Sequence, residues 1–74
     1  MLVYFSIYIM IILYTTHCPK CRVLEGKLKS KNIKFTTFTN VDEMIQLGIT
    51  ESPVLDYNNQ RMGFVDAINF VNSL

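Results

Sequence analysis

The sequence contains few cysteines and histidines and has almost no net charge. Its 74 residues include two cysteines and one histidine, and seven basic residues nearly balance six acidic ones, which leaves a net charge of +1. The low cysteine count excludes the dense disulfide framework of small secreted proteins, so we expect a reducing, cytoplasmic setting. The near-neutral charge gives no indication of the basic surface that binds nucleic acid or an anionic membrane. Half of the residues are hydrophobic, which predicts one ordered domain with a packed core.

The first sixteen residues carry no charge, yet they fit neither a signal peptide nor a membrane span. The basic start and the small-residue cleavage site of a signal peptide are both missing. A span needs about 20 apolar residues, which would run into the cysteine motif that follows. The stretch is rich in β-branched and aromatic residues, so we expect a buried central strand over residues 9–14. We interpret residues 1–9 as a dispensable apolar extension and residues 10–74 as the folded domain, and we expect a monomer without membrane attachment.

Both cysteines lie in one motif, Cys18-Pro19-Lys20-Cys21. Thiols at this spacing can close a disulfide within one helical turn, supply half of a tetrahedral zinc site, or be buried as small hydrophobes. A zinc site would need two more ligands, and only His17 is at hand, so it would require a second chain or a carboxylate. The motif favours the redox pair most and leaves the other two interpretations open. His17 is not assigned a catalytic role, because an exposed residue beside a reactive loop is more often incidental.

Pro19 predicts that a helix begins at this motif, because proline is favoured at the first helical position. Cys18 then becomes the N-cap, where unpaired backbone N–H groups and the positive end of the helix dipole favour a thiolate. Lys20 and Arg22 add positive charge nearby. We therefore predict that Cys18 is the nucleophile. Cys21, one turn further on the apolar helix face, is predicted to be a buried resolving cysteine with a more ordinary thiol.

The rest of the chain predicts alternating strands and helices. Asn40 followed by Glu43 resembles a capping box, and Asn58-Asn59 suits a two-residue hairpin turn. Asp66 is expected to cap the last helix. A strand, a helix and a strand within about thirty residues imply a parallel crossover. The expected elements are strand 9–14, helix 19–31, strand 34–39, helix 41–47, strand 54–57, strand 60–62 and helix 67–74, an α/β domain of order β-α-β-α-β-β-α with a four-stranded mixed sheet and flanking helices.

With strand, Cys-Pro-Lys-Cys and helix in this order, the sequence resembles the glutaredoxins and the related NrdH-type redoxins of ribonucleotide reductase, in the thioredoxin superfamily. The resemblance covers residues 10–74. Residues 12–21 match the family's strand and active-site motif, residues 47–55 match its approach to a cis-proline, and residues 62–66 look like its glycine turn before the last helix. The resemblance implies a thioredoxin-like, glutaredoxin-like fold and a thiol–disulfide oxidoreductase.

The resemblance also implies a mechanism, in which the Cys18 thiolate attacks a substrate disulfide and Cys21 then attacks Cys18 to release the reduced substrate. Pro53 would be cis and lie beside Cys18, and the backbone of Ser52 would pair with the substrate chain. The other substrate-binding residues that it implies are Pro19, Lys20, Gly63 and Asp66. The alternative is a module of the same fold that binds a metal or an iron–sulfur cluster between two chains through Cys18.

The departures from the family pattern concern the reductant. Members that use glutathione usually carry a lysine before the first cysteine, Thr-Val before the proline and Gly-Gly before the last helix, whereas this chain has Thr15-Thr16, Glu51-Ser52 and Met62-Gly63. Glu51 would face a glutathione carboxylate, and Met62 would fill space that glycine leaves open. We therefore expect no bound cofactor and an external reductant, either a thioredoxin-reductase-like flavoenzyme or a low-molecular-weight thiol, with glutathione as second choice. The expected partners are that reductant and a disulfide-containing protein substrate, of which ribonucleotide reductase is one candidate.

Overall fold

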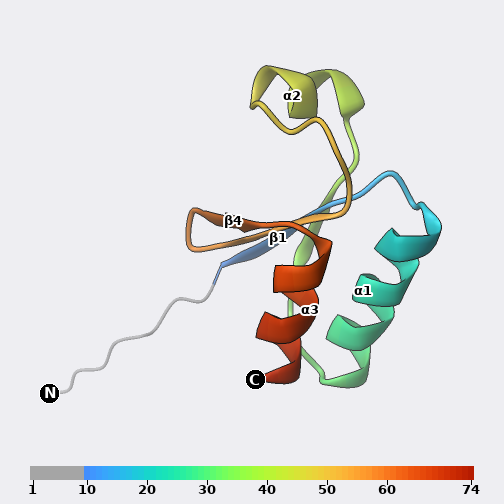
Figure 1. Cartoon of the computed structure of the whole chain (residues 1–74), viewed down its shortest axis with the longest axis vertical. Coiled ribbons are helices and arrows are strands. Elements are labelled where there is room, and N and C mark those ends of the chain that lie inside the picture. The colour runs from blue at the N-terminus through green and yellow to red at the C-terminus, as the bar shows by residue number, and fades with distance from the viewer. Residues whose placement is uncertain (1–9) are drawn as a thin grey trace, which may run out of the picture.

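The computed structural model describes residues 10–74, which form a four-stranded mixed sheet and three helices (Figure 1). The elements are, in order, β1 (Ile11–Tyr14), α1 (Pro19–Ser30), β2 (Thr36–Phe38), α2 (Val41–Gln46), β3 (Val54–Tyr57), β4 (Gln60–Met62) and α3 (Phe64–Asn72). This order confirms the predicted β-α-β-α-β-β-α arrangement, and the extension predicted for residues 1–9 lies outside the described residues. No helix in the described part of the chain is long and apolar enough to cross a membrane.

β1 occupies a central position in the sheet, whose strand order is β2-β1-β3-β4. β1 is parallel to β2 and antiparallel to β3, which in turn is antiparallel to β4. α1 therefore connects two parallel neighbours, as predicted. Because parallel strands end at the same edge of a sheet, the cysteine motif that follows β1 lies beside the end of β2.

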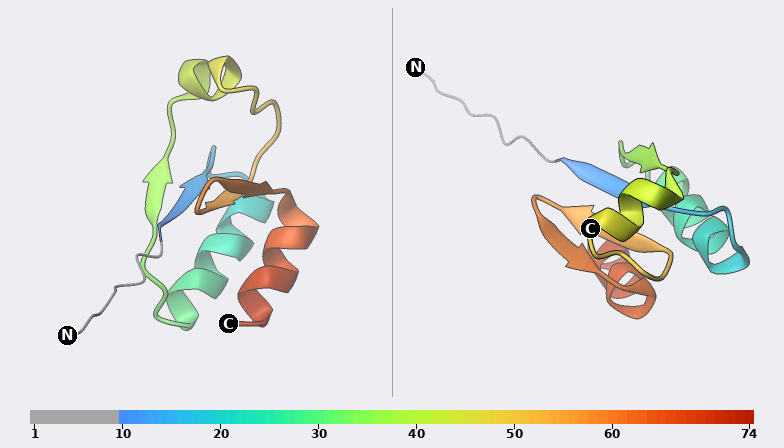
Figure 2. Two further views of the ribbon diagram at one scale, coloured as in Figure 1. Left: turned by 90° about the vertical axis from the view of Figure 1, so that its left-hand side faces the viewer. Right: turned by 90° about the horizontal axis from the view of Figure 1, so that it is seen from above.

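Successive residues of β1 point to opposite faces of the sheet, and each face carries its own core. The buried members of the first core, which α1 and α3 cover, are Ile11, Leu13, Leu24, Leu28, Leu55, Ala67 and Val71. Those of the second core, which α2 covers, are Tyr14, Met44, Ile49 and Val54. Figures 1 and 2 show the result, with α1 and α3 side by side on one side of the sheet and α2 on the other.

α3 begins earlier than the sequence predicted. Its N-cap is Gly63, with extended backbone (φ −73°, ψ −175°) and no side-chain cap bond, and Asp66 lies inside the first turn. The prediction that Asp66 caps this helix is therefore wrong. The cause is tertiary, because the apolar stripe that packs on the first core already starts at the first helical residue. Its members, spaced i, i+3, i+4 and i+7, are Phe64, Ala67, Ile68 and Val71.

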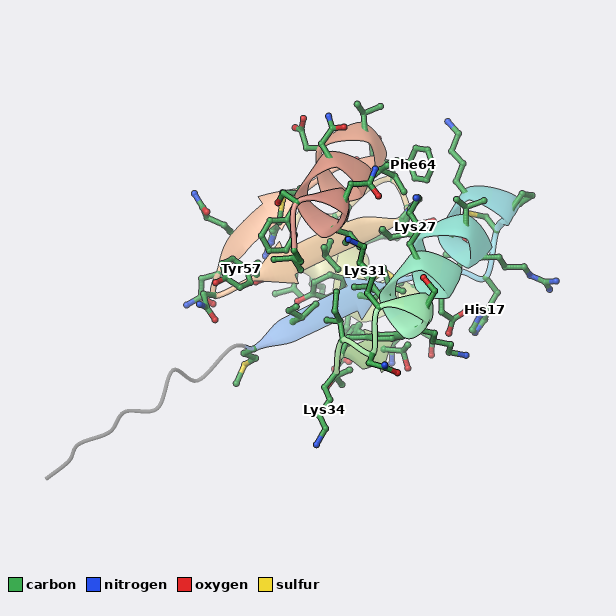
Figure 3. All side chains as sticks on the ribbon, turned by 90° about the horizontal axis from the view of Figure 1, so that it is seen from below. His17, Lys27, Lys31, Lys34, Tyr57 and Phe64 are labelled. Atoms are coloured by element: carbon green, nitrogen blue, oxygen red, sulfur yellow. The ribbon has the colours of Figure 1, made fainter. Side chains whose placement is uncertain are left out.

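Lys27 in α1 and Lys31, the C-cap of α1, connect that helix to the end of α3. Lys27 Nζ donates to Asn72 Oδ1 at 3.0 Å, and Lys31 Nζ donates to the carbonyl oxygens of Asn72 and Leu74, both at 3.3 Å. Figure 3 shows Lys27 and Lys31 pointing from α1 toward α3, whereas Lys34 points away. These cations lie at the carboxyl end of α3, where the helix dipole is negative. The basic residues of α1 thus stabilise the packing of two helices.

Candidate active site

Cys18 is the N-cap of α1, as predicted. Its backbone is extended (φ −69°, ψ 168°), Pro19 is the first helical residue, and the Cys21 N–H donates to Cys18 Sγ at 3.2 Å. The Arg22 N–H donates to the Cys18 carbonyl oxygen at 2.9 Å, which is the first α-helical bond of α1. The Cys18 sulfur therefore lies at the positive end of the helix dipole with a backbone donor directed at it, and both features stabilise a thiolate.

Thr15 stabilises the turn between β1 and Cys18, although the sequence pointed to this residue only as a departure from the glutathione-using pattern. Thr15 is 2% exposed, and its Oγ1 accepts the His17 N–H at 2.9 Å. His17 adopts a positive φ of 64°, and its carbonyl oxygen accepts from Arg22 Nε at 3.3 Å. The alternation of β1 contained the missing signal, because Ile11, Leu13 and Thr15 share one face, the face that α1 covers. Thr15 thus fixes the turn that delivers Cys18 to the start of the helix.

The two sulfurs form a free pair whose Sγ atoms are 2.6 Å apart. Burial raises the pKa of the Cys21 thiol, but hydrogen bonds with the Cys18 thiol, the Thr15 hydroxyl, the Thr16 backbone and the Ser52 hydroxyl together lower this pKa to about 6. The prediction that Cys21 carries an ordinary thiol is therefore wrong, although its burial, at 1% exposed, is confirmed. Cys18 is only partly buried. The pair holds an anion near neutral pH, and Cys18 is the sulfur that solvent can reach.

The Ser52–Pro53 peptide bond is cis, as predicted, and this loop lies against the thiol pair. The Ser52 carbonyl oxygen is 3.9 Å from Cys18 Sγ, and the hydroxyls of Ser52 and Thr16 are hydrogen-bonded at 2.9 Å. These residues are far apart in the sequence, so tertiary structure alone brings them together. The arrangement places Ser52 next to both sulfurs, with its backbone carbonyl near Cys18 and its hydroxyl hydrogen-bonded to Cys21.

The other substrate-binding residues predicted from the sequence differ in their surroundings and in their relation to the thiol pair. Lys20 Nζ lies 5.5 Å from the centre of the Phe64 ring, so its charge is directed toward the start of α3. Gly63 lines a hollow of about 250 Å³, together with Glu51 and Arg61. The Asp66 side chain makes no hydrogen bond or ion pair within the described residues, and no contact connects it to the thiols.

Arg61 does not serve as a free cation in this hollow. Its Nη1 donates to the carbonyl oxygen of Leu47 at 2.7 Å, immediately after α2. The bond directs the guanidinium toward the negative end of the short α2 helix, where a cation is stabilised. Glu51, by contrast, forms no ion pair within residues 10–74.

The thiol pair supplies only half of a tetrahedral metal site. Among residues 10–74, no group of three or more His, Cys, Asp or Glu side chains is placed to hold a metal ion. The thiol pair itself can ionise, attack a disulfide and close a bond between Cys18 and Cys21.

No family model matches the chain, and no curated protein or solved structure is significantly similar to it.

Proposed function

We propose that this chain is a thiol–disulfide oxidoreductase with a thioredoxin-like fold of the glutaredoxin and NrdH-type redoxin kind. The observation that carries the proposal is the contact of three features at one edge of the sheet. A partly exposed N-cap thiol, Cys18, lies beside a buried partner thiol, Cys21, and beside the backbone that precedes cis-Pro53. The sheet order and the three helices are compatible with this fold.

The chemistry proceeds in two steps. The Cys18 thiolate attacks one sulfur of a substrate disulfide, which breaks the substrate S–S bond, forms a mixed disulfide and releases the other substrate sulfur as a thiolate that takes up a proton. The Cys21 thiolate then attacks Cys18 Sγ, which forms the Cys18–Cys21 disulfide and releases the second substrate thiol. The substrate gains two electrons and two protons, and the protein loses both. A reductant must return them before the next turnover.

Accessibility assigns the two roles. Cys21 is 1% exposed, so no substrate disulfide can approach its sulfur, whereas Cys18 is partly open. In the reduced protein the two sulfurs are hydrogen-bonded to each other, so the anion implied by the lowered pKa of Cys21 belongs to the pair, and Cys18 is the member that a substrate can reach. Cys18 is therefore the nucleophile and Cys21 the resolving thiol.

The loop before cis-Pro53 supplies the place where the substrate chain binds. The Ser52 carbonyl oxygen lies 3.9 Å from Cys18 Sγ, so the backbone of a substrate cysteine joined to Cys18 comes within hydrogen-bonding reach of it. In the resembling families the residue at this place pairs with substrate like an added strand. Ser52 is itself held by the hydroxyl of Thr16 at 2.9 Å, which keeps the loop close to the sulfur.

For the reductant we propose a thioredoxin-reductase-like flavoenzyme or a low-molecular-weight thiol, with glutathione as the second choice. Glu51, which forms no ion pair within residues 10–74, precedes Ser52 directly and would repel the carboxylates of glutathione. The substrate class is a protein disulfide, with ribonucleotide reductase as one candidate, in a reducing cytoplasm.

The experiment compares the wild type with Cys18→Ser and Cys21→Ser in the reduction of bis(2-hydroxyethyl) disulfide. We expect Cys18→Ser to abolish the first step and Cys21→Ser to accumulate a mixed disulfide that mass spectrometry detects on Cys18. Turnover is then followed with thioredoxin reductase or with glutathione and its reductase, and we expect the former to sustain the faster rate.

Equal inactivity of the wild type and both variants would refute the oxidoreductase. A coloured protein that contains iron, or one that binds zinc through Cys18, would instead favour the metal-binding alternative. Faster regeneration by glutathione would leave the chemistry intact and overturn the assignment of the reductant.

A further inference from the structure

The surface next to Ser52 carries an apolar hollow with a single charged side chain on its wall. The hollow has a volume of about 150 Å³, and α2 and the loop before cis-Pro53 line it. In other proteins an apolar cavity of about this size accommodates benzene. Its apolar lining residues are Val41, Met44, Ile45 and Ile49. We call it the α2 hollow.

The α2 hollow is continuous with the thiol site. Thr16 and Ser52, whose hydroxyls are hydrogen-bonded to each other, line it, and the Ser52 carbonyl oxygen is 3.9 Å from Cys18 Sγ. Neighbouring residues of an extended chain are about 3.3 Å apart. A side chain one or two residues from a substrate cysteine bound at Cys18 therefore reaches the hollow.

The rim of the hollow exposes apolar surface that the fold does not need. Val41 is 51% exposed and Ile45 is 58% exposed, and as i, i+4 neighbours on α2 they lie on one face of the helix. The residue that attaches this helix to the second core is Met44, which is buried. Val41 and Ile45 are thus free to contact another molecule without any rearrangement of the core.

The charge on this side of Cys18 is negative. Glu51 lines the α2 hollow and has no ion-pair partner within the described residues, and Asp42 and Glu43 lie in the first turn of α2. No cation forms an ion pair with Glu51 within the described residues, although Arg61 lines the neighbouring hollow of about 250 Å³ together with it. Lys20 lies over Phe64, Arg22 donates to the turn before Cys18, and Arg61 donates to the carbonyl oxygen of Leu47.

We propose that the α2 hollow and Glu51 select the substrate of this site, a polypeptide disulfide in which an apolar and a basic side chain flank the cysteine. The apolar side chain enters the hollow against Val41 and Ile45, and the basic side chain lies beside Glu51. This inference rests on the proposed oxidoreductase activity and adds the substrate class to it. The same carboxylate disfavours anionic disulfides at this position.

The test uses three short peptides with the same pattern on both sides of one cysteine, each oxidised to its symmetric disulfide, so that the direction of binding does not matter. Their sequences are Lys-Leu-Cys-Leu-Lys, Glu-Leu-Cys-Leu-Glu and Lys-Ser-Cys-Ser-Lys, all with blocked ends. Rates are measured with the full-length chain at low ionic strength and compared with bis(2-hydroxyethyl) disulfide. We expect kcat/KM for the Lys-Leu peptide to exceed that for the Glu-Leu peptide about fivefold, because the difference spans one attraction and one repulsion at a surface carboxylate.

Two variants test whether Glu51 and Ile45 cause this selectivity. Glu51→Lys should invert the preference between the Lys-Leu and Glu-Leu peptides. Ile45→Ser should lower the ratio of kcat/KM for the Lys-Leu peptide to that for the Lys-Ser peptide about threefold to tenfold, because the apolar contact is lost. Leu74→Ser is the matched control, since Leu74 is 56% exposed and lies at the far end of α3. This control should leave every ratio unchanged.

Ratios that stay the same in Glu51→Lys and Ile45→Ser would overturn the inference while Cys18-dependent reduction of bis(2-hydroxyethyl) disulfide preserved the proposed function. Loss of selectivity in Leu74→Ser to the same degree would also overturn it. If no disulfide is reduced in a Cys18-dependent manner, both the proposed function and this inference fail.

Discussion

The reactivity of the thiol pair should fall only about tenfold between pH 7 and pH 5. With the pKa at about 6, about nine tenths of the molecules carry a thiolate at pH 7 and about one tenth at pH 5. An unperturbed thiol with a pKa of about 8.5 would lose about a hundredfold over the same interval. The ratio of the two rates therefore reports whether the lowered pKa of the pair exists.

The absolute rate is a weaker indicator than this ratio. At pH 7 the pair holds about thirty times more thiolate than an ordinary cysteine, but a thiolate of lower pKa is also a weaker nucleophile. With a Brønsted coefficient of about 0.45, lowering the pKa of the thiol by about 2.5 lowers the intrinsic rate constant of its thiolate about tenfold. The net gain at pH 7 is then only about threefold, and at pH 5 it is about thirtyfold.

The assay is the rate of alkylation of the reduced protein by iodoacetamide from pH 4.5 to 9, followed together with thiolate absorbance at 240 nm. A midpoint near pH 6 in both curves is the expected result. Cys18→Ala should move the absorbance midpoint upward, because the hydrogen bond with the Cys18 thiol is the largest of the interactions that lower the pKa of Cys21. A hundredfold fall in rate between pH 7 and pH 5, with no absorbance step below pH 8, would refute the reasoning.

The same shift makes the stability of the reduced protein depend on pH. The folded-state pKa of Cys21, about 6, lies below the value of an unfolded thiol, so the unfolded chain binds more protons between these two values. The free energy of unfolding should therefore rise as the pH increases from 6 toward about 8.5, and this contribution is lost as the pH falls through 6. Thermal unfolding of the oxidised protein, whose thiols cannot titrate, is the control and should not show this rise.

Three further outcomes follow from single side chains. Thr15→Val should raise the pKa of Cys21 and shift the pH midpoint upward, because Thr15 hydrogen-bonds that sulfur, whereas Thr15→Ser should restore the wild-type midpoint. Leu28→Ala should lower the free energy of unfolding by about 2–5 kcal/mol in urea denaturation, since Leu28 is fully buried in the first core, and Leu74→Ala at the exposed end of α3 should change it by less than about 0.5 kcal/mol. Asn59→Ala should lower the free energy of unfolding by about 1 kcal/mol, whereas Asn59→Gly should leave it unchanged or raise it, because Asn59 has a φ of 72°. Equal urea midpoints for these two variants would contradict the importance of the turn conformation.

Local chemistry accounts for the features that the sequence predicted best. Pro19 places the start of α1, and with it the N-cap role of Cys18, through a backbone constraint that acts within one residue. The Asn40 side chain accepts from the Glu43 N–H at 3.1 Å, and Asn58 and Asn59 adopt the positive φ values of a two-residue hairpin turn. These interactions span at most three residues, so the order of elements and the bounds of β3 and β4 could be predicted from the sequence alone.

Contacts between distant residues decided the rest. The start of α3 follows the core and not Asp66, because packing of Phe64 on the first core begins the helix earlier than a capping side chain would. The roles of Thr15 and the α2 hollow were also missed, since burial and proximity at these places arise only when β1, α1 and the loop before Pro53 meet.

The cysteine pair, the buried strand before it and the helix that begins at it could all be predicted from the sequence. The groups that surround the two sulfurs became apparent only in the fold. Ser52 is 34 positions from Cys18, yet its carbonyl oxygen is 3.9 Å from the Cys18 sulfur, and its hydroxyl contributes to the low pKa of Cys21. The physical reason is that helix starts and turns depend on neighbouring residues along the chain, whereas the pKa of a thiol depends on every group that folding brings within a few ångströms of it.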